Sequence, residues 1–182
     1  MTQLPQDGSA VAAVTEPERP EGFRRVRAAL AERGHPHAPR FLDVAARTAQ
    51  EAADALGVTV GQIAKSVIFR RKRDDVAVLV VTSGDKRVDE KKVAAIVAQA
   101  GAEGPAGLGR ADADYVKART GFSIGGVSPV AHATTPVTLI DRELFRFDVV
   151  WAAAGHPNGV FPATPQQLVD LTGAPVADVV QG

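Results

Sequence analysis

The sequence predicts a globular domain that combines α-helices and β-strands, an α/β mixed (α+β) fold, and three observations lead to this prediction. The chain has 182 residues, 45% hydrophobic and 23% charged, so it can bury one substantial core but has no room for a second full domain. Segments with helical periodicity and capping signals are interleaved with segments rich in branched apolar residues. Their order lacks the even strand–helix alternation of a doubly wound sheet.

The ordered domain is expected to begin near Pro20. The preceding stretch mixes proline, glycine, serine and acidic residues without a helical or strand period, which predicts a disordered N-terminal tail over residues 1–20. Residues 21–182 are therefore predicted to form a single domain.

Helical signals come first along this domain. In the segment 20–34 the apolar residues fall on one helical stripe, and Gly34 follows where a left-handed C-cap belongs. Two further helices are predicted to start at capping boxes, and the first of these helices closes at Gly57. The stripe consists of Phe23, Val26 and Leu30, and the capping pairs are Thr48 with Glu51 and Thr59 with Gln62.

Strands are predicted next. "SVIFRRK" (66–72) and "VAVLVVTSG" (76–84) are rich in branched apolar residues and are joined by Arg-Asp-Asp, which predicts a hairpin. The second strand is apolar from Val76 to Val81, so we expect it to be buried on both faces. "PVTLIDREL" (136–144) and "FDVVWAAAG" (147–155) predict two more strands around a turn.

Three more helices are predicted in the second half of the chain. "VDEKKVAAIVAQAG" (88–101) and "ADADYVKARTG" (111–121) have helical character. The last helix starts at a third capping box, has Pro165 at its first position and ends at Gly173, before "PVADVV". The box is Thr164 with Gln167, and the residues of 88–101 expected to face inward are Val93, Ile96 and Val97.

Charge and composition exclude several classes of protein. With 21 basic and 21 acidic residues the formal net charge is zero, so any contact with nucleic acid must be local. The absence of cysteine excludes disulfides, thiolate zinc sites and a cysteine nucleophile. No N-terminal targeting pattern and no apolar run of about 20 residues is present. We therefore expect a cytoplasmic protein without a membrane or DNA partner.

A glycine-rich stretch, "GFSIGGVSPVAH" (121–132), separates two segments of ordinary secondary structure. Glycine lacks a Cβ, so it allows positive φ angles and a close approach of the main chain to a ligand, and it carries an entropic cost on folding. This stretch is therefore either a complicated turn or a site.

Three motif interpretations of the sequence have to be weighed, and the first concerns this glycine-rich stretch. Gly121 to Gly125 reads G-x-S-x-G, and Asp141 or Asp148 and then His156 follow in hydrolase order, so Ser123 is a candidate esterase nucleophile. A nucleophile elbow must run from a strand straight into a helix, however, and Gly125-Gly126 followed by Pro129 would break that helix within its first turn. "GVTVGQIAKS" (57–66) suggests a P-loop, but three residues separate its second glycine from the lysine. The four histidines show no metal-ligand spacing, so neither a metal site nor a cofactor is predicted.

An ordered set of strings resembles a known family. "IAKSVIFR", "VTSGDKRVDEKKV", "TGFSIGGVSPV", "LIDREL", "AAAGHPN" and "TPQQLVDLTGA" are similar to the YbaK/EbsC family, stand-alone relatives of the editing domain of bacterial prolyl-tRNA synthetases. The resemblance covers roughly residues 23–180, and its most specific part is Lys65 upstream of a G-x-x-x-P loop at 125–129. It implies a mixed, barrel-like curled β-sheet surrounded by helices. It also implies trans-editing, the hydrolysis of the ester that joins a wrong small amino acid to the 3′ end of a tRNA.

The resemblance also implies roles for individual residues. Lys65 would anchor the substrate end, and the backbone N–H groups of Gly125 and Gly126 would stabilise the charge that develops on the carbonyl oxygen. Pro129 would fix the exit of the loop, because its φ angle is locked. A hydroxyl of the terminal ribose would assist the attacking water. The residues expected to line the substrate site are Ser66, Ser128, His156 and Asn158.

The sequence leaves an alternative function and several partners open. A non-catalytic module that binds tRNA or nucleotide would use the same groove, although retention of Lys65 and the whole glycine loop favours an enzyme. The expected partner is the 3′ acceptor end of an aminoacyl-tRNA, an aminoacyl-tRNA synthetase is a further candidate partner, and the chain is expected to be a monomer or weak homodimer. Alanine, cysteine, serine and non-protein amino acids are all possible substrates. The candidate tRNA-facing charges are Arg24, Arg25, Arg27, Arg70, Arg71, Lys72 and Arg73.

Overall fold

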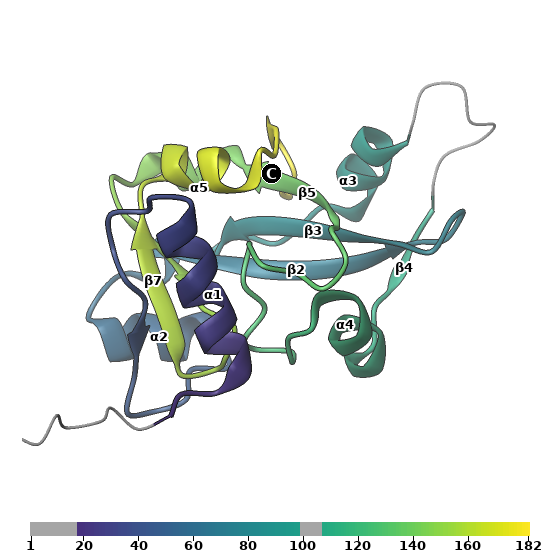
Figure 1. The fold of residues 1–182 in the computed structure, drawn as a ribbon. Coiled ribbons are helices and arrows are strands. Elements are labelled where there is room, and N and C mark those ends of the chain that lie inside the picture. Colours follow the sequence, from purple (N-terminus) through teal and green to yellow (C-terminus); the bar gives the residue numbers. More distant parts are fainter. Residues whose placement is uncertain (1–17, 99–106) are drawn as a thin grey trace, which may run out of the picture.

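The computed structural model describes residues 18–98 and 107–182, and its centre is one eight-stranded mixed sheet (Figure 1). The strand order is β1-β7-β6-β2-β3-β5-β8, and β4 pairs with β2 outside this path. The strands are β1 (Arg40–Phe41), β2 (Ile63–Arg71), β3 (Val76–Ser83), β4 (Leu108–Arg110), β5 (Val137–Asp141), β6 (Val150–Ala153), β7 (Gly159–Ala163) and β8 (Val176–Ala177). Parallel and antiparallel pairs both occur, which confirms the predicted fold class.

Helices lie on both faces of this sheet. They are α1 (Glu21–Glu32), α2 (Ala49–Leu56), α3 (Glu90–Val97), α4 (Ala113–Thr120) and α5 (Pro165–Thr172), with single 3₁₀ turns η1 (Val60–Gln62) and η2 (Arg142–Arg146). The predicted capping boxes form at Thr48, Thr59 and Thr164. Gly57 and Gly173 adopt the left-handed conformation at the ends of α2 and α5, so both helices begin and end where the sequence predicts. In the described part of the chain, no helix combines the length and the apolar character that a membrane span requires.

The β2–β3 hairpin forms the middle of the sheet, with a register running from Ala64 opposite Ser83 to Arg71 opposite Val76. β3 is buried on both faces, as predicted, because alternate residues enter different clusters of apolar side chains. Leu79 and Val81 face the main core, whereas Val78 and Val80 face α3.

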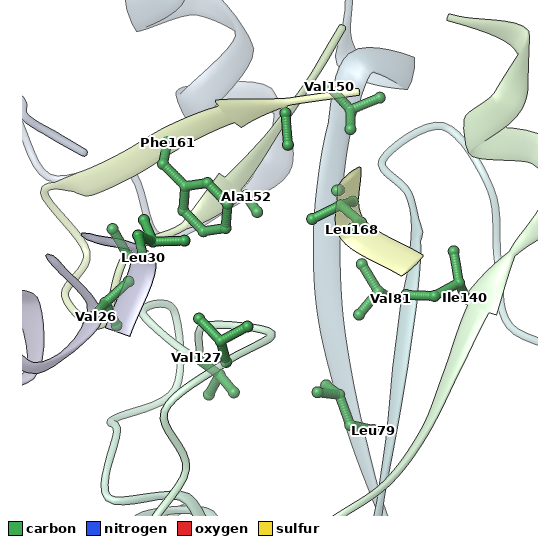
Figure 2. Close-up of a cluster of buried hydrophobic side chains, with 14 of the residues drawn as sticks. Val26, Leu30, Leu79, Val81, Val127, Ile140, Val150, Ala152, Phe161 and Leu168 are labelled. Carbon is green, nitrogen blue, oxygen red and sulfur yellow. The ribbon is translucent and has the colours of Figure 1, made fainter. Parts of the chain in front are cut away.

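The main core fills the space between the sheet and the helices α1, α4 and α5. In Figure 2, Val26 and Leu30 of α1 point toward Phe161 of β7, and Val127 approaches them from the glycine-rich loop. Phe122 of the same loop is only 1% exposed. The glycine-rich loop is therefore anchored by its own apolar side chains, which fixes its backbone against the sheet.

The opposite face carries α2 and α3, which lie near the two ends of β2. Ile63 at the start of β2 packs against alanines of α2, whereas Phe69 near its end packs in the cluster of α3. Because Ile63, Lys65, Val67 and Phe69 alternate along one strand, they share this face. Lys65 thus lies on the stretch of β2 between the two helices.

Some sequence predictions are wrong in detail. The helix predicted from Thr59 is a single 3₁₀ turn, and β2 begins at Ile63 instead of Ser66, so Lys65 is the third residue of this strand. Ile96 was expected to face inward but is 43% exposed, because the short α3 packs through Val93 and Val97. β7 and the short strands β1, β4 and β8 were not predicted. Most of the predicted tail (1–17) and the end of the predicted helix (99–101) lie outside the described residues.

Candidate active site

A cavity of about 290 Å³ opens where β2 and β6 separate. The two strands pair in parallel only at Ile63 with Trp151 and Ala64 with Ala152. Beyond this point the start of α2 and the glycine-rich loop line the gap from two sides. The wall is mostly apolar, and its polar side chains are Arg47, Thr48, Lys65 and Ser66.

Lys65 occupies one side of this cavity and is held in place by its neighbours. Its ammonium nitrogen donates a hydrogen bond to the carbonyl oxygen of Lys86 at 2.7 Å. Burial lowers the pKa of Lys65 below its usual value, and the carboxylates of Asp85 and Asp141 act in the opposite direction. The side chain is therefore an oriented point charge and hydrogen-bond donor at the edge of an apolar cavity.

The loop that carries Lys86 is fixed by a buried carboxylate. Asp141 is fully buried and accepts hydrogen bonds from the hydroxyl of Thr82 at 2.7 Å and the backbone N–H of Ser83 at 3.2 Å. It also accepts from the N–H of Glu143 at 2.9 Å, and so caps the 3₁₀ turn η2. Because both β3 and β5 end at this group, the carbonyl that holds Lys65 has little freedom to move.

Ser66, the next residue of β2, also places polar groups at the cavity. Its hydroxyl oxygen is buried and has no hydrogen-bond partner among the described residues. The N–H of Gly84 bonds the carbonyl of Ile63, so Ile63 and Lys65 direct their backbone groups toward β3. By alternation the N–H and C=O of Ser66 point to the opposite edge, where none of the described strands pairs with it. Unpaired backbone groups thus border the gap.

The two central glycines of the loop have different roles. Gly125 lines the cavity and has φ +90°, a conformation that glycine adopts without strain. Gly126 does not line the cavity, and its N–H donates to the carbonyl of Ser123 at 3.0 Å. A Cβ on Gly126 would lie 2.7 to 2.9 Å from backbone atoms of His156. The second glycine therefore permits close packing of two loops.

Free backbone donors remain on this loop. The N–H groups of Gly125 and Val127 make no hydrogen bond to any residue that the structure describes, and both residues line the cavity. Val127 is 5% exposed and its side chain is part of the main core. These two N–H groups are on a rigid backbone, as stabilisation of an oxyanion requires.

Of the residues predicted from sequence, Lys65, Ser66 and Gly125 meet at the cavity, and the other five do not line it. Ser128 is fully buried, and its hydroxyl accepts the N–H of Val130 at 3.2 Å. Pro129, in the same loop, lines a separate hollow instead of the cavity. His132 shares this hollow, and its ring nitrogen contacts the carbonyl of Ser128 at 2.6 Å.

His156 and Asn158 lie outside the cavity, in the segment that packs against the glycine-rich loop. The amide of Asn158 donates to the carbonyl of Leu42 at 2.8 Å, and its backbone N–H donates to the Nδ1 atom of His156 at 3.0 Å. The His156 ring stacks beside Phe41, and burial, followed by the charge of Arg47, lowers the pKa of His156. The backbone of His156 is thus the surface against which Gly126 packs.

The alternative esterase site is not assembled. No hydrogen bond joins Ser123, Asp141 and His156 in the described structure: Asp141 binds Thr82 and Ser83, and Nδ1 of His156 binds a backbone amide. No helix follows Ser123 directly, as a nucleophile elbow requires.

Arg47 and Trp151 line the cavity and were not predicted from sequence. Arg47 is exposed, forms no ion pair with a described residue, and lies so that a Cβ on Gly125 would be 3.5 Å from its Cα, Cβ and Cγ atoms. It precedes a helix cap and matches no motif, so only the fold brings it to the loop.

Two of the candidate tRNA-facing arginines serve the fold. Arg25 donates to the carbonyls of Ala131 at 2.9 Å and Thr120 at 3.2 Å. Arg71 is 4% exposed and bonds Asp74 and the carbonyl of Val97.

Within the described ranges, no three histidine, aspartate or glutamate side chains are grouped as around a metal ion.

Comparison with known proteins adds four findings. A family model described as an aminoacyl-tRNA editing domain matches residues 43–171. The uncharacterized protein YwhH of Bacillus subtilis (strain 168) is 33% identical over 131 residues, which are 71% of this chain and 78% of YwhH. The crystal structure of a candidate trans-editing enzyme for prolyl-tRNA synthetase superimposes with a TM-score of 0.79 at 40% identity, covering 91% of this chain and all of the other. The hypothetical protein APE2540 gives a TM-score of 0.77 at 30% identity, over 86% and 99% of the two chains.

Proposed function

The chain belongs to the aminoacyl-tRNA editing domain family, and on this premise we propose that it is a trans-editing deacylase that removes a mischarged small amino acid from tRNA. Family membership confirms the resemblance to YbaK/EbsC proteins and makes aminoacyl-tRNA the partner. The observation that carries the proposal is the meeting of Lys65, Ser66 and Gly125 around one cavity, although Lys65 and Gly125 are 60 residues apart in sequence.

Backbone N–H groups perform the central chemical task in this proposal. The carbonyl oxygen of the ester accepts hydrogen bonds from the N–H groups of Gly125 and Val127, which have no other described partner. These bonds strengthen as negative charge develops in the tetrahedral intermediate, and removal of one such donor in other hydrolases costs about 100- to 1000-fold in rate. Gly126 contributes by holding the loop, because its own N–H is already used.

Lys65 orients the substrate from the opposite wall. Its ammonium donates to the carbonyl of Lys86 and has further protons for an oxygen of the substrate ribose or of its 5′ phosphate. Arg47 adds a second cation at the wall of the cavity. Two cations on opposite sides of the ester would favour the anionic end of a nucleic acid over a neutral ester.

The reaction itself needs no covalent enzyme intermediate. Water adds to the carbonyl carbon, the bond from that carbon to the ribose oxygen breaks, and the proton from water ends on the ribose oxygen. Neither a carboxylate nor an imidazole is among the side chains that line the cavity. The neighbouring hydroxyl of the terminal ribose, which the family resemblance implicates, therefore orients the water. The products are a free amino acid and a tRNA with a free 3′ end.

The cavity volume favours a short amino-acid side chain. About 290 Å³ is at the lower limit of small-molecule sites, and the same space must admit part of the ribose. Differences of about 1 to 3 kcal/mol per methylene would then separate neighbouring amino acids.

Deacylation of purified tRNAs charged with alanine, serine, cysteine, threonine or proline tests this proposal. We expect hydrolysis of at least one small amino acid well above the spontaneous rate, with no hydrolysis of a bulky one such as phenylalanine. Tight binding of the charged tRNAs without hydrolysis would instead support the non-catalytic module.

A further inference from the structure

A second hollow of about 680 Å³ lies along the same face of β2. Its floor includes Lys65, Val67 and Phe69 of β2, and its wall is the segment from Arg87 to Lys91, where the loop after β3 enters α3. Lys65 lines both this hollow and the 290 Å³ cavity in which we place the ester. A chain whose end enters the cavity can therefore leave past Lys65 along the hollow, which we call the β2–α3 groove.

The wall of the β2–α3 groove is held rigidly by the last part of the described chain. The N–H of Asp89 bonds the carbonyl of Val179 at 2.8 Å, and the N–H of Gln181 bonds the carbonyl of Arg87 at 2.9 Å. Val88 and Val180 form a bridge between these segments. The positions of the side chains that project from this wall are thus preset by backbone contacts.

The cations of this wall differ from their neighbours in ion pairing. Lys86 lies 3.7 Å from Glu143, and Lys92 lies 3.0 Å from Asp178, so both are paired. Arg87 and Lys91 are exposed and form no ion pair with any described residue.

Two carboxylates share this wall with the cations. Asp89 uses its carboxylate to accept the N–H groups of Lys91 and Lys92 at the start of α3, and Glu90 is exposed. Two unpaired cations thus remain on one side of an apolar floor that begins at the proposed ester site.

We propose that the β2–α3 groove binds the single-stranded 3′ end of the tRNA, with Arg87 and Lys91 contacting the phosphates next to the terminal nucleoside. This inference rests on the proposed function, because the ester has to lie beside Lys65. Unpaired cations beside apolar side chains are the combination that binds single-stranded nucleic acid, because the cations attract the phosphates and the apolar side chains contact the bases. The basic hairpin turn at Lys72 and Arg73 is the competing location.

The test compares two substrates that differ in phosphates. One is the aminoacyl-tRNA with the amino acid found in the screen above, and the other is the same amino acid esterified to adenosine, which has no phosphate. In the double variant Arg87→Gln/Lys91→Gln, kcat/KM for the tRNA substrate should fall about three- to tenfold at 0.1 M salt. Its dependence on salt should flatten by about 1.4 in log–log slope, roughly 0.7 for each lost phosphate contact. Hydrolysis of the adenosine ester should not change.

Two further variants are matched controls. Lys72→Gln/Arg73→Gln removes the same charge from the hairpin turn and should leave both substrates unaffected, whereas Glu90→Gln should increase kcat/KM for the tRNA substrate. Equal loss on both substrates, or a loss only in the hairpin variant, would overturn the groove proposal. Binding of uncharged tRNA, followed by fluorescence anisotropy, separates the two proposals. If no ester is hydrolysed but the groove variant binds about three- to tenfold more weakly, the groove stands and the catalytic proposal fails.

Discussion

Substitution of Gly126 by alanine tests whether the glycine-rich loop depends on close packing. A Cβ at this position would lie 2.7, 2.8 and 2.9 Å from the C, Cα and N atoms of His156. Ordinary contacts begin near 3.4 Å, so the loop or its neighbour must move by about 0.7 Å, the difference between 3.4 and 2.7 Å. Both partners are backbone, so no side chain can rotate away.

The expected magnitude follows from this displacement. Overpacking of this kind costs about 1 to 3 kcal/mol of unfolding free energy, or about 2 to 12 °C in Tm for a chain of this length. A displacement of about 1 Å in a catalytic group costs on the order of 100-fold in rate, so a shift of about 0.7 Å should reduce turnover per folded molecule about tenfold or more.

Gly125→Ala is the matched comparison. Its Cβ would meet Arg47 at an ordinary 3.5 Å, but φ is +90°. This variant should lose about 1 to 2 kcal/mol of stability through backbone strain, and it should lose less turnover than Gly126→Ala. The assay is single-turnover deacylation, corrected for the folded fraction from thermal unfolding. If Gly126→Ala has the Tm and turnover of the wild type, the packing argument is refuted.

Three further predictions concern residues around the loop. Arg47→Gln should raise KM for aminoacyl-tRNA several-fold with kcat retained, because a cation outside the reacting bonds contributes binding, and a fall in kcat alone would contradict this role. Ser123→Ala should keep most of the activity, and serine-directed phosphonates should not label the protein; a labelled Ser123 would restore the esterase interpretation. Burial lowers the pKa of His132, so the unfolded state binds a proton near pH 6.5 more readily than the folded state, and stability present above that pH is lost as pH falls below it. The loss, at most about 1.4 kcal/mol per pH unit for each such histidine, should be smaller in His132→Phe when urea unfolding is compared at pH 7.5 and 5.5. An equal loss in both proteins would exclude His132 as its source.

Local sequence signals predicted most of the helices but few of the sheet partners. Thr48 with Glu51 and Thr164 with Gln167 mark real helix starts because a capping box is complete within four residues. At Thr59 the Gln62 side chain accepts the Thr59 N–H, but the N–H of Gln62 bonds the Thr59 carbonyl in a 3₁₀ turn and the chain turns into β2 at once, since the pairing of Ile63 overrides a local signal. β7 was missed because it lies in a short run between a loop and a helix and is defined by its partners β1 and β6.

The candidate site was predictable only where a motif named its residues. The resemblance identified Lys65 and Gly125, which meet at the cavity. It could not separate the two glycines, because the contact of Gly126 with His156 joins loops that are 30 residues apart. Arg47 carries no local signal, since its place in the wall depends on how α2 lies against the glycine-rich loop.

Single-turnover deacylation by the Lys65 variants tests the central claim most directly. Lys65→Met keeps the length of the side chain and removes its charge, and Lys65→Ala removes both. With the tRNA that the wild-type protein deacylates fastest, both variants should retain a wild-type circular dichroism spectrum and lose about 100-fold or more of the rate, a loss as large as that of an oxyanion donor. A folded Lys65→Met protein that deacylates this tRNA at the wild-type rate would contradict the claim that the cavity between β2 and the glycine-rich loop is the active site.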